Sequence, residues 1–141
     1  MNDINNHAEL ENLLEDWADS ASQTKKAFAR LLDRLRRTPD LSLDFVARPG
    51  VTYSLRAKHT AQTKRDLFAM VDVIDDDPAE RWLSVCFYGD FITDPEENGD
   101  FVPEGLLGED AICFDLESKD DELTEYVKAR LEEAWRSAKQ G

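Results

Sequence analysis

The chain has few of the residues that build common catalytic and metal centres. Its 141 residues include two cysteines and two histidines. It contains no HExxH, CxxC or GxSxG motif and no Gly-rich phosphate-binding loop. We therefore expect no zinc site and no cofactor. Because no activated nucleophile or acid–base pair stands out, the sequence favours a binding protein over an enzyme.

Long apolar runs are also missing, and none approaches the roughly 20 residues that a membrane helix needs. The first ten residues, MNDINNHAEL, lack the basic and apolar regions of a signal peptide. Cys86 and Cys113 fall within predicted strands, without the spacing of a metal or redox site. We expect a cytoplasmic protein, with no membrane partner, in which both cysteines are reduced core thiols; a bridge between neighbouring strands is the alternative.

Positive charge is scarce and unevenly distributed. Seventeen Lys and Arg stand against 31 Asp and Glu, which gives a net charge of −14. Residues 24–65 carry +8, whereas residues 66–124 carry −17. Phosphate backbones bind cationic surfaces, so we expect no nucleic-acid partner. The asymmetry serves solubility in the simplest interpretation; alternatively, the basic and acidic segments face different partners or pair between subunits.

The stretch from Asp66 to Tyr88 organises the predicted fold. It reads as two apolar strands, 67–74 and 82–88, joined by an acidic loop that contains Pro78. The first strand has apolar residues in both alternating sets, a pattern typical of a central strand with two dry faces. We therefore expect other segments to cover both of its faces.

Amphipathic stripes predict helices over residues 8–21 and 24–37. The stripes are nearly in phase, so one long helix is the alternative, but serine and threonine at 20–24 favour a break. A third stripe runs to Ala138 after a predicted N-cap at Ser118. Residues 1–7 are expected to be frayed.

Three further strands are predicted over 41–48, 51–57 and 111–116, and residues 93–110 are predicted to form a long acidic loop. The order is helix, helix, five strands, helix. Short connections favour an α+β fold in a single domain over 1–141, with an antiparallel five-stranded meander and the helices packed on it.

A candidate ligand site follows from the second face of this sheet. If the strands pair as a meander, aromatic side chains gather there beside an arginine, a hydroxyl and a carboxylate. Arg56 is suited to a carboxylate or phosphate. In the alternative interpretation the face is ordinary, and Arg56 pairs with Asp115. The predicted ligand-binding residues are Ser54, Arg56, Trp82, Cys86, Tyr88 and Asp115.

The loop over 94–104 partly matches a calcium-binding loop. Oxygen-bearing side chains occupy its first, third, fifth and seventh positions, and Gly99 stands at the sixth. Gly105 stands where a bidentate Glu is required, and the alternative is that Asn98-Gly99 forms a hairpin turn. The candidate metal ligands are Asp94, Glu96, Asn98 and Asp100.

Two functional hypotheses result. In the first, the protein is a non-catalytic binding or interaction module. It uses the mixed sheet face or an edge strand to bind a small anionic ligand, a protein or a second copy of itself. In the second, it is a small enzyme with an unfamiliar site around Arg56, Cys86, Tyr88 and His59.

Overall fold

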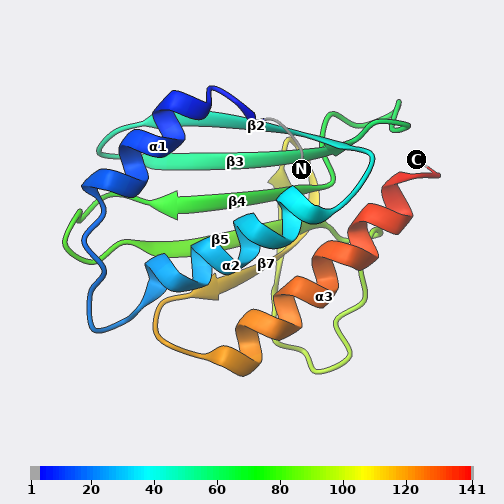
Figure 1. Ribbon diagram of the computed structural model, residues 1–141. Coiled ribbons are helices and arrows are strands. Elements are labelled where there is room, and N and C mark those ends of the chain that lie inside the picture. Colours follow the sequence, from blue (N-terminus) through cyan, green and yellow to red (C-terminus); the bar gives the residue numbers. More distant parts are fainter. Residues whose placement is uncertain (1–3, 141) are drawn as a thin grey trace.

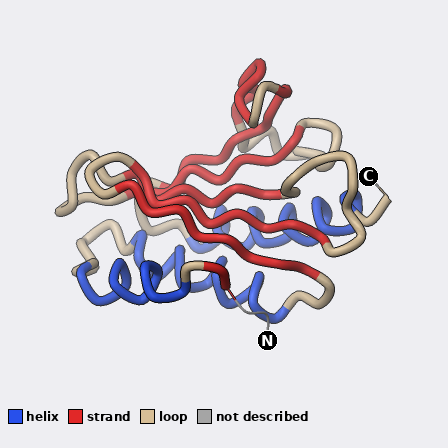
Figure 2. Tube along the Cα trace, turned by 90° about the horizontal axis from the view of Figure 1, so that it is seen from above, coloured by secondary structure: helices blue, strands red, loops and turns tan. Residues whose placement is uncertain are grey.

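The computed structural model describes residues 4–140 as three helices packed on one sheet (Figure 1). The helices are α1 (His7–Asp16), α2 (Thr24–Arg37) and α3 (Asp121–Ala138). All three lie on the same side of the sheet (Figure 2). The α+β class is thereby confirmed. None of the helices within residues 4–140 is long and apolar enough to cross a membrane.

The sheet has seven strands in the order β1-β2-β3-β4-β5-β7-β6. The short β1 runs parallel to β2, and every other neighbouring pair is antiparallel. The strands are β1 (Ile4–Asn5), β2 (Leu41–Arg48), β3 (Thr52–His59), β4 (Ala69–Ile74), β5 (Trp82–Tyr88), β6 (Asp100–Leu106) and β7 (Glu109–Leu116).

The predicted five-stranded antiparallel meander is therefore wrong in detail. Residues 93–110 are not one loop, because they contain β6 and its turn into β7. Leu107 and Gly108 both have positive φ and form a two-residue hairpin turn. The chain thus places β7 beside β5 and β6 at the edge. The hairpin turn lies here, not at Asn98-Gly99.

Both chain ends also differ from the prediction. Ile4 pairs with β2 and is buried, so residues 4–7 are ordered parts of the fold; residues 1–3 lie outside the described structure. The N-cap of α3 is Asp120, whose side chain accepts a hydrogen bond from the Leu123 amide, and not Ser118. An aspartate here also complements the helix dipole.

The break between α1 and α2 was predicted correctly, but α1 ends earlier than expected. It stops at Asp16, and Trp17 follows in an extended conformation with its side chain buried. Gln23, in the left-handed region, precedes α2. Residues 17–23 thus form a connection, and α2 packs its stripe of Phe28 and three leucines into the core.

An ion-pair cluster fastens both N-terminal helices to the sheet. Arg81 donates from Nε to Asp75 (2.6 Å) and from Nη2 to Asp16 at the end of α1 (3.0 Å). The Thr24 hydroxyl at the start of α2 donates to the Arg81 carbonyl (2.5 Å). The Arg81 and Asp75 side chains are each 3% exposed, so this pair is removed from solvent.

The core lies between the helices and one face of the sheet. On β4, Ala69, Val71 and Val73 point into it and are fully buried. The alternate residues Met70 and Ile74 are only partly buried. The prediction that both faces of this strand would be covered is therefore wrong, because all three helices pack on the same side.

Candidate interaction surface

The side of the sheet that faces away from the helices is the candidate functional surface, and we call it the open face. It is formed by the alternate residues of β2–β5 and β7, whose rows are defined by the strand register. Figure 2 shows the helices on one side of the sheet and the β6–β7 hairpin standing away on the other. The predicted gathering of Ser54, Arg56, Trp82, Cys86 and Asp115 on one face agrees with this register.

Apolar side chains lie at the centre of the open face. Met70 pairs with Cys86, and Ile74 pairs with Trp82, across the neighbouring strands β4 and β5. All four are partly exposed. Large apolar side chains left partly in solvent on a sheet are typical of surfaces that contact another molecule.

A polar row crosses the same strands. Ser54, Asp72, Ser84 and Asp115 are successive register partners on β3, β4, β5 and β7. Asp72 Oδ1 is buried and has no hydrogen-bond partner among residues 4–140. Burial raises the pKa of Asp72, whereas a side-chain hydrogen bond with Ser54 and the charges of Arg56 and Arg48 oppose that rise. Burial and the nearby Glu117 and Asp100 likewise raise the pKa of Asp115.

Charges of both signs lie on β2–β4, where Asp44 and Asp72 accompany the cations, and a further anion lies on β7. The cations Arg48, Arg56 and Lys58 lie on β2 and β3, and Asp115 lies on β7 at the opposite side. Arg56 Nε donates to Ser54 (3.3 Å), and none of the ion pairs among residues 4–140 involves Arg56. The predicted alternative of an Arg56–Asp115 pair is therefore not formed, since β4 and β5 separate the two strands.

Cys86 and Cys113 form a disulfide, contrary to the expectation of reduced thiols. They are direct register partners on β5 and β7, with Cα atoms 4.2 Å apart. The alternative of a bridge between neighbouring strands is the one that the structure shows. A cysteine in a disulfide has no thiol to act as a nucleophile.

Tyr88 continues the alternate set of Trp82, Ser84 and Cys86 on β5 and pairs with Ala111, but its side chain is covered there. It is 1% exposed, and the Arg65 guanidinium lies 4.1 Å from its ring centroid. Arg65 is in turn bound by Asp90 (2.8 Å) and Glu109 (2.7 Å). Those two hydrogen-bonded carboxylates, Glu109 first, raise the pKa of Arg65 further above its ordinary value.

This Arg65 cluster was missed in the sequence. A hollow of about 400 Å³ adjoins it, lined partly by Asp90, Glu109 and the exposed Phe101. Most donors of the guanidinium are already used within the chain. Because Arg65, the pair Tyr88 and Asp90, and Glu109 come from three separate stretches, no local pattern could have found the cluster.

His59 lies on the opposite side of the sheet from Arg56 and Cys86. It pairs with Leu41, and its ring lies 5.2 Å from that of Trp135 on α3. Its Nδ1 accepts the Ala61 amide. The structure thus does not bring together the four residues of the predicted enzyme site: Arg56, Cys86, Tyr88 and His59.

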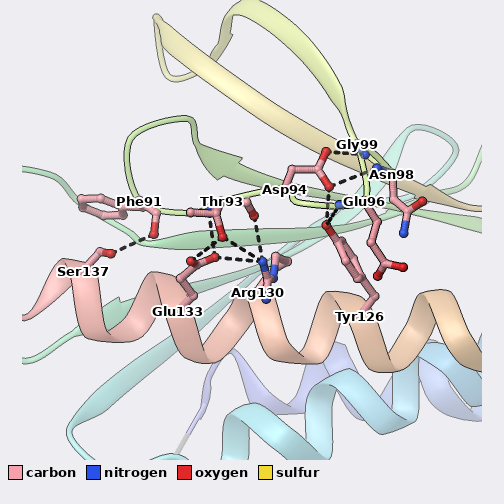
Figure 3. Close-up of polar contacts among 10 residues, drawn as sticks. All are labelled: Phe91, Thr93, Asp94, Glu96, Asn98, Gly99, Tyr126, Arg130, Glu133 and Ser137. Atoms are coloured by element: carbon pink, nitrogen blue, oxygen red, sulfur yellow. Dashed lines mark hydrogen bonds and ion pairs between the residues drawn. The ribbon is translucent and has the colours of Figure 1, made fainter.

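The predicted calcium loop is anchored to α3 instead (Figure 3). Asp94 Oδ1 accepts the Tyr126 hydroxyl (2.5 Å) and the Asn98 amide (3.0 Å), and Oδ2 accepts the Gly99 amide (2.8 Å). Burial tends to raise the pKa of Asp94, but these donors hold it below its ordinary value.

The remaining predicted ligands do not complete a site around Asp94. Glu96 contributes its backbone amide to the Tyr126 hydroxyl oxygen, and Asp100 belongs to β6 beside Cys113. Within residues 4–140 no group of three or more His, Cys, Asp or Glu is arranged to hold a metal ion. Calcium binding by Asp94, Glu96, Asn98 and Asp100 stays a prediction without geometric support.

Comparison with protein families, with curated proteins and with solved structures finds no significant match to this chain.

Proposed function

We propose that this protein is a non-catalytic interaction module and that its open face binds the partner. The observation that carries the proposal is the sheet itself: all three helices pack on one side and leave the other uncovered. That uncovered side combines partly exposed Trp82 and Ile74 with the unpaired cation of Arg56.

The chemistry of the face supports binding over catalysis. The face carries polar groups that one chain does not fully satisfy: a buried carboxylate oxygen without a donor, as at Asp72, costs about 1–3 kcal/mol. The sulfurs of Cys86 and Cys113 are tied in a disulfide, and His59 lies on the other side. Cys86 and His59 therefore cannot act on this face as a nucleophile and its base.

A small anionic ligand at Arg56 is the second candidate. It is favoured by the guanidinium having only Ser54 as its hydrogen-bond acceptor in the described chain. Arg56 lines none of four hollows found among residues 4–140, and it stands on the open sheet face. A flat surface suits a protein partner better than a small molecule.

The test compares Arg56→Glu with Lys26→Glu, which makes the same charge change at an exposed position on α2. Each protein is immobilised and exposed to a lysate of its source cells, and each is screened by thermal shift with phosphate, citrate and dicarboxylates. We expect a partner or anion that the wild type and Lys26→Glu retain and Arg56→Glu loses. If both variants bind as the wild type does, the open face is not the binding surface.

A further inference from the structure

The polar row on the open face is self-complementary: its hydrogen-bond donors and acceptors alternate, so that a reversed copy of the row matches it. Read from β3 to β7 it runs Ser54, Asp72, Ser84, Asp115. Hydroxyl and carboxylate therefore alternate as donor, acceptor, donor, acceptor. The same row read backwards begins with an acceptor, so every carboxylate of one row meets a hydroxyl of a reversed row.

From this order, and resting on the proposed function, we infer that the partner of the open face is a second copy of this chain. The two sheets stack face to face about a two-fold axis that runs along the strands, between β4 and β5. Such an axis lays β4 of one copy over β5 of the other, and β3 over β7. Isologous pairing of this kind is the commonest arrangement of protein dimers.

The axis sets each carboxyl group of the polar row against a hydroxyl of the second copy. Asp72 then faces Ser84 of the second copy, and Asp115 faces the second copy's Ser54. Stacked sheets lie about 10 Å apart, so these short side chains meet directly or through one bridging water. Each contact occurs twice by symmetry. Asp72 Oδ1 is already shielded from solvent within one chain, so the second copy meets the part of the carboxyl group that remains partly exposed.

The neighbouring rows match under the same axis. Ile74 comes to face the second copy's Trp82, and Met70 comes to face its Cys86, since these residues are register partners across β4 and β5. The partly exposed apolar centre of each copy would thereby be removed from water. This burial supplies the main favourable term for association.

Charge balance also points to a second copy. The open-face residues of β2–β5, together with those from Ala111 to Asp115 on β7, include three cations and three anions. The whole chain, in contrast, has a net charge of −14. A polycation or polyanion would match only half of such a face. Stacking β3 over β7 instead sets the β2–β4 side of each copy, which holds the three cations and two of the anions, against the side of the other copy that holds Asp115. The six residues are Arg48, Arg56, Lys58, Asp44, Asp72 and Asp115.

The other in-plane axis, perpendicular to the strands, is unfavourable. It would lay β4 over β4 and set Asp72 against the second copy's Asp72. It would also place both β6–β7 hairpins, which stand up from the open side, at the same edge (Figure 2). The axis along the strands places the hairpins at opposite edges, where each flanks β2 of the other copy.

The size of the face predicts a weak dimer. Five strands about 4.8 Å apart and about 20 Å long give a projected area of roughly 500 Å², near the lower limit for specific interfaces. We expect a concentration-dependent equilibrium in the micromolar range, and not a permanent dimer.

The experiment is sedimentation equilibrium of the full chain from low to high micromolar concentration. We expect a monomer–dimer equilibrium that Ile74→Arg weakens roughly a hundredfold, because a cation would be buried at the axis. The matched control is Val51→Arg, since Val51 is also apolar and is 58% exposed at the β2–β3 turn, outside the face. This control should dimerise like the wild type.

A second pair of variants tests the axis itself. Ser84→Asp sets a carboxylate against the second copy's Asp72 twice, and should weaken the dimer about tenfold. Adding Asp72→Ser restores the alternation between copies, so the double variant should regain most of the affinity. Circular dichroism melts of each variant, run below the dissociation constant, separate lost association from lost folding.

A wild type that stays monomeric at high micromolar concentration overturns the inference. So does equal behaviour of Ile74→Arg and Val51→Arg, or a Ser84→Asp variant that folds but is not rescued by Asp72→Ser. A monomer that still loses another partner through Arg56→Glu would leave the proposed function standing. If the wild type does not dimerise and Arg56→Glu loses no partner either, the open face is not a binding surface.

Discussion

The two faces of this sheet are built from alternate residues of the same strands, yet they differ in burial and in hydrogen bonding. On β4, Val71 and Val73 are fully buried under the helices, whereas Met70 and Ile74 remain partly exposed. On the open face Asp72 keeps a carboxylate oxygen without a donor in the described chain. The comparison indicates that one face stabilises the monomer and the other is free to recognise a partner.

The largest expected effect is a difference in the free energy of unfolding between truncations on the helix-covered face and on the open face. Phe87 is fully buried on the helix side of β5, so Phe87→Ala should lower the free energy of unfolding by about 3–5 kcal/mol. Met70→Ala, on the open face, should cost about 1 kcal/mol because the side chain is already partly in water. Urea unfolding measures both. Equal losses would mean that the faces do not differ as described.

The next effect concerns the buried ion pair that fastens the helices. Asp75→Asn leaves the Arg81 guanidinium without its buried counter-charge and should cost about 3 kcal/mol. The control is Asp76→Asn, because Asp76 is exposed and the change should stay within about 0.5 kcal/mol. Urea unfolding again gives the result. If the two variants unfold alike, the ion pair does not hold the helix side together.

How far the sequence could predict this comparison depends on the kind of signal. Alternating hydrophobicity placed the strands over 41–48 and 82–88 correctly, and it assigned Arg56 and Trp82 to the same face of the sheet, as the register shows. These features follow from local periodicity, which directly reports which face of a strand is buried. The charge asymmetry between residues 24–65 and 66–124 could also be read directly from the sequence.

What the sequence missed depended on contacts between distant segments. β6 is almost wholly exposed and contains Pro103, so it lacks the apolar alternation that marks a strand. The pairing of Cys86 with Cys113 required the register of β5 against β7. That β4 has one open face could not be predicted, because it depends on all three helices packing on the same side.

An intermediate effect tests the electrostatics of the open face. Burial raises the pKa of Asp72, so the folded monomer holds this proton more tightly than the unfolded chain. Ionisation of Asp72 therefore lowers stability as pH rises through the folded-state pKa. Asp72→Asn, measured at monomeric concentration, should melt higher than the wild type at pH 7, and the gain should disappear below the ordinary carboxyl pKa of 3.8.

A second variant on the same face serves as the control for this prediction. Asp44→Asn changes another carboxyl on the same face, which accepts a hydrogen bond from Asn5. It should not raise the melting temperature at pH 7. A gain for Asp44→Asn as large as that for Asp72→Asn would show a general charge effect and not a buried acceptor.

The smallest effect lies at the sheet edge, away from both faces. Tyr126→Phe removes the hydroxyl that Asp94 accepts and should cost about 1 kcal/mol by thermal unfolding. Dimerisation should be unchanged, because the loop is anchored to α3 (Figure 3). Calorimetry with calcium on the wild type completes the test, since a heat of binding would contradict the assignment of Asp94 to an internal anchor.

The most direct test of the account compares the two faces within one strand. Methyl NMR spectra of the wild-type protein are recorded as its concentration is raised through the micromolar range. If the open face dimerises, the methyl signals of Met70 and Ile74 shift, while those of Val71 and Val73 stay in place. Shifts confined to the two valines, or no shift at any concentration, would contradict it.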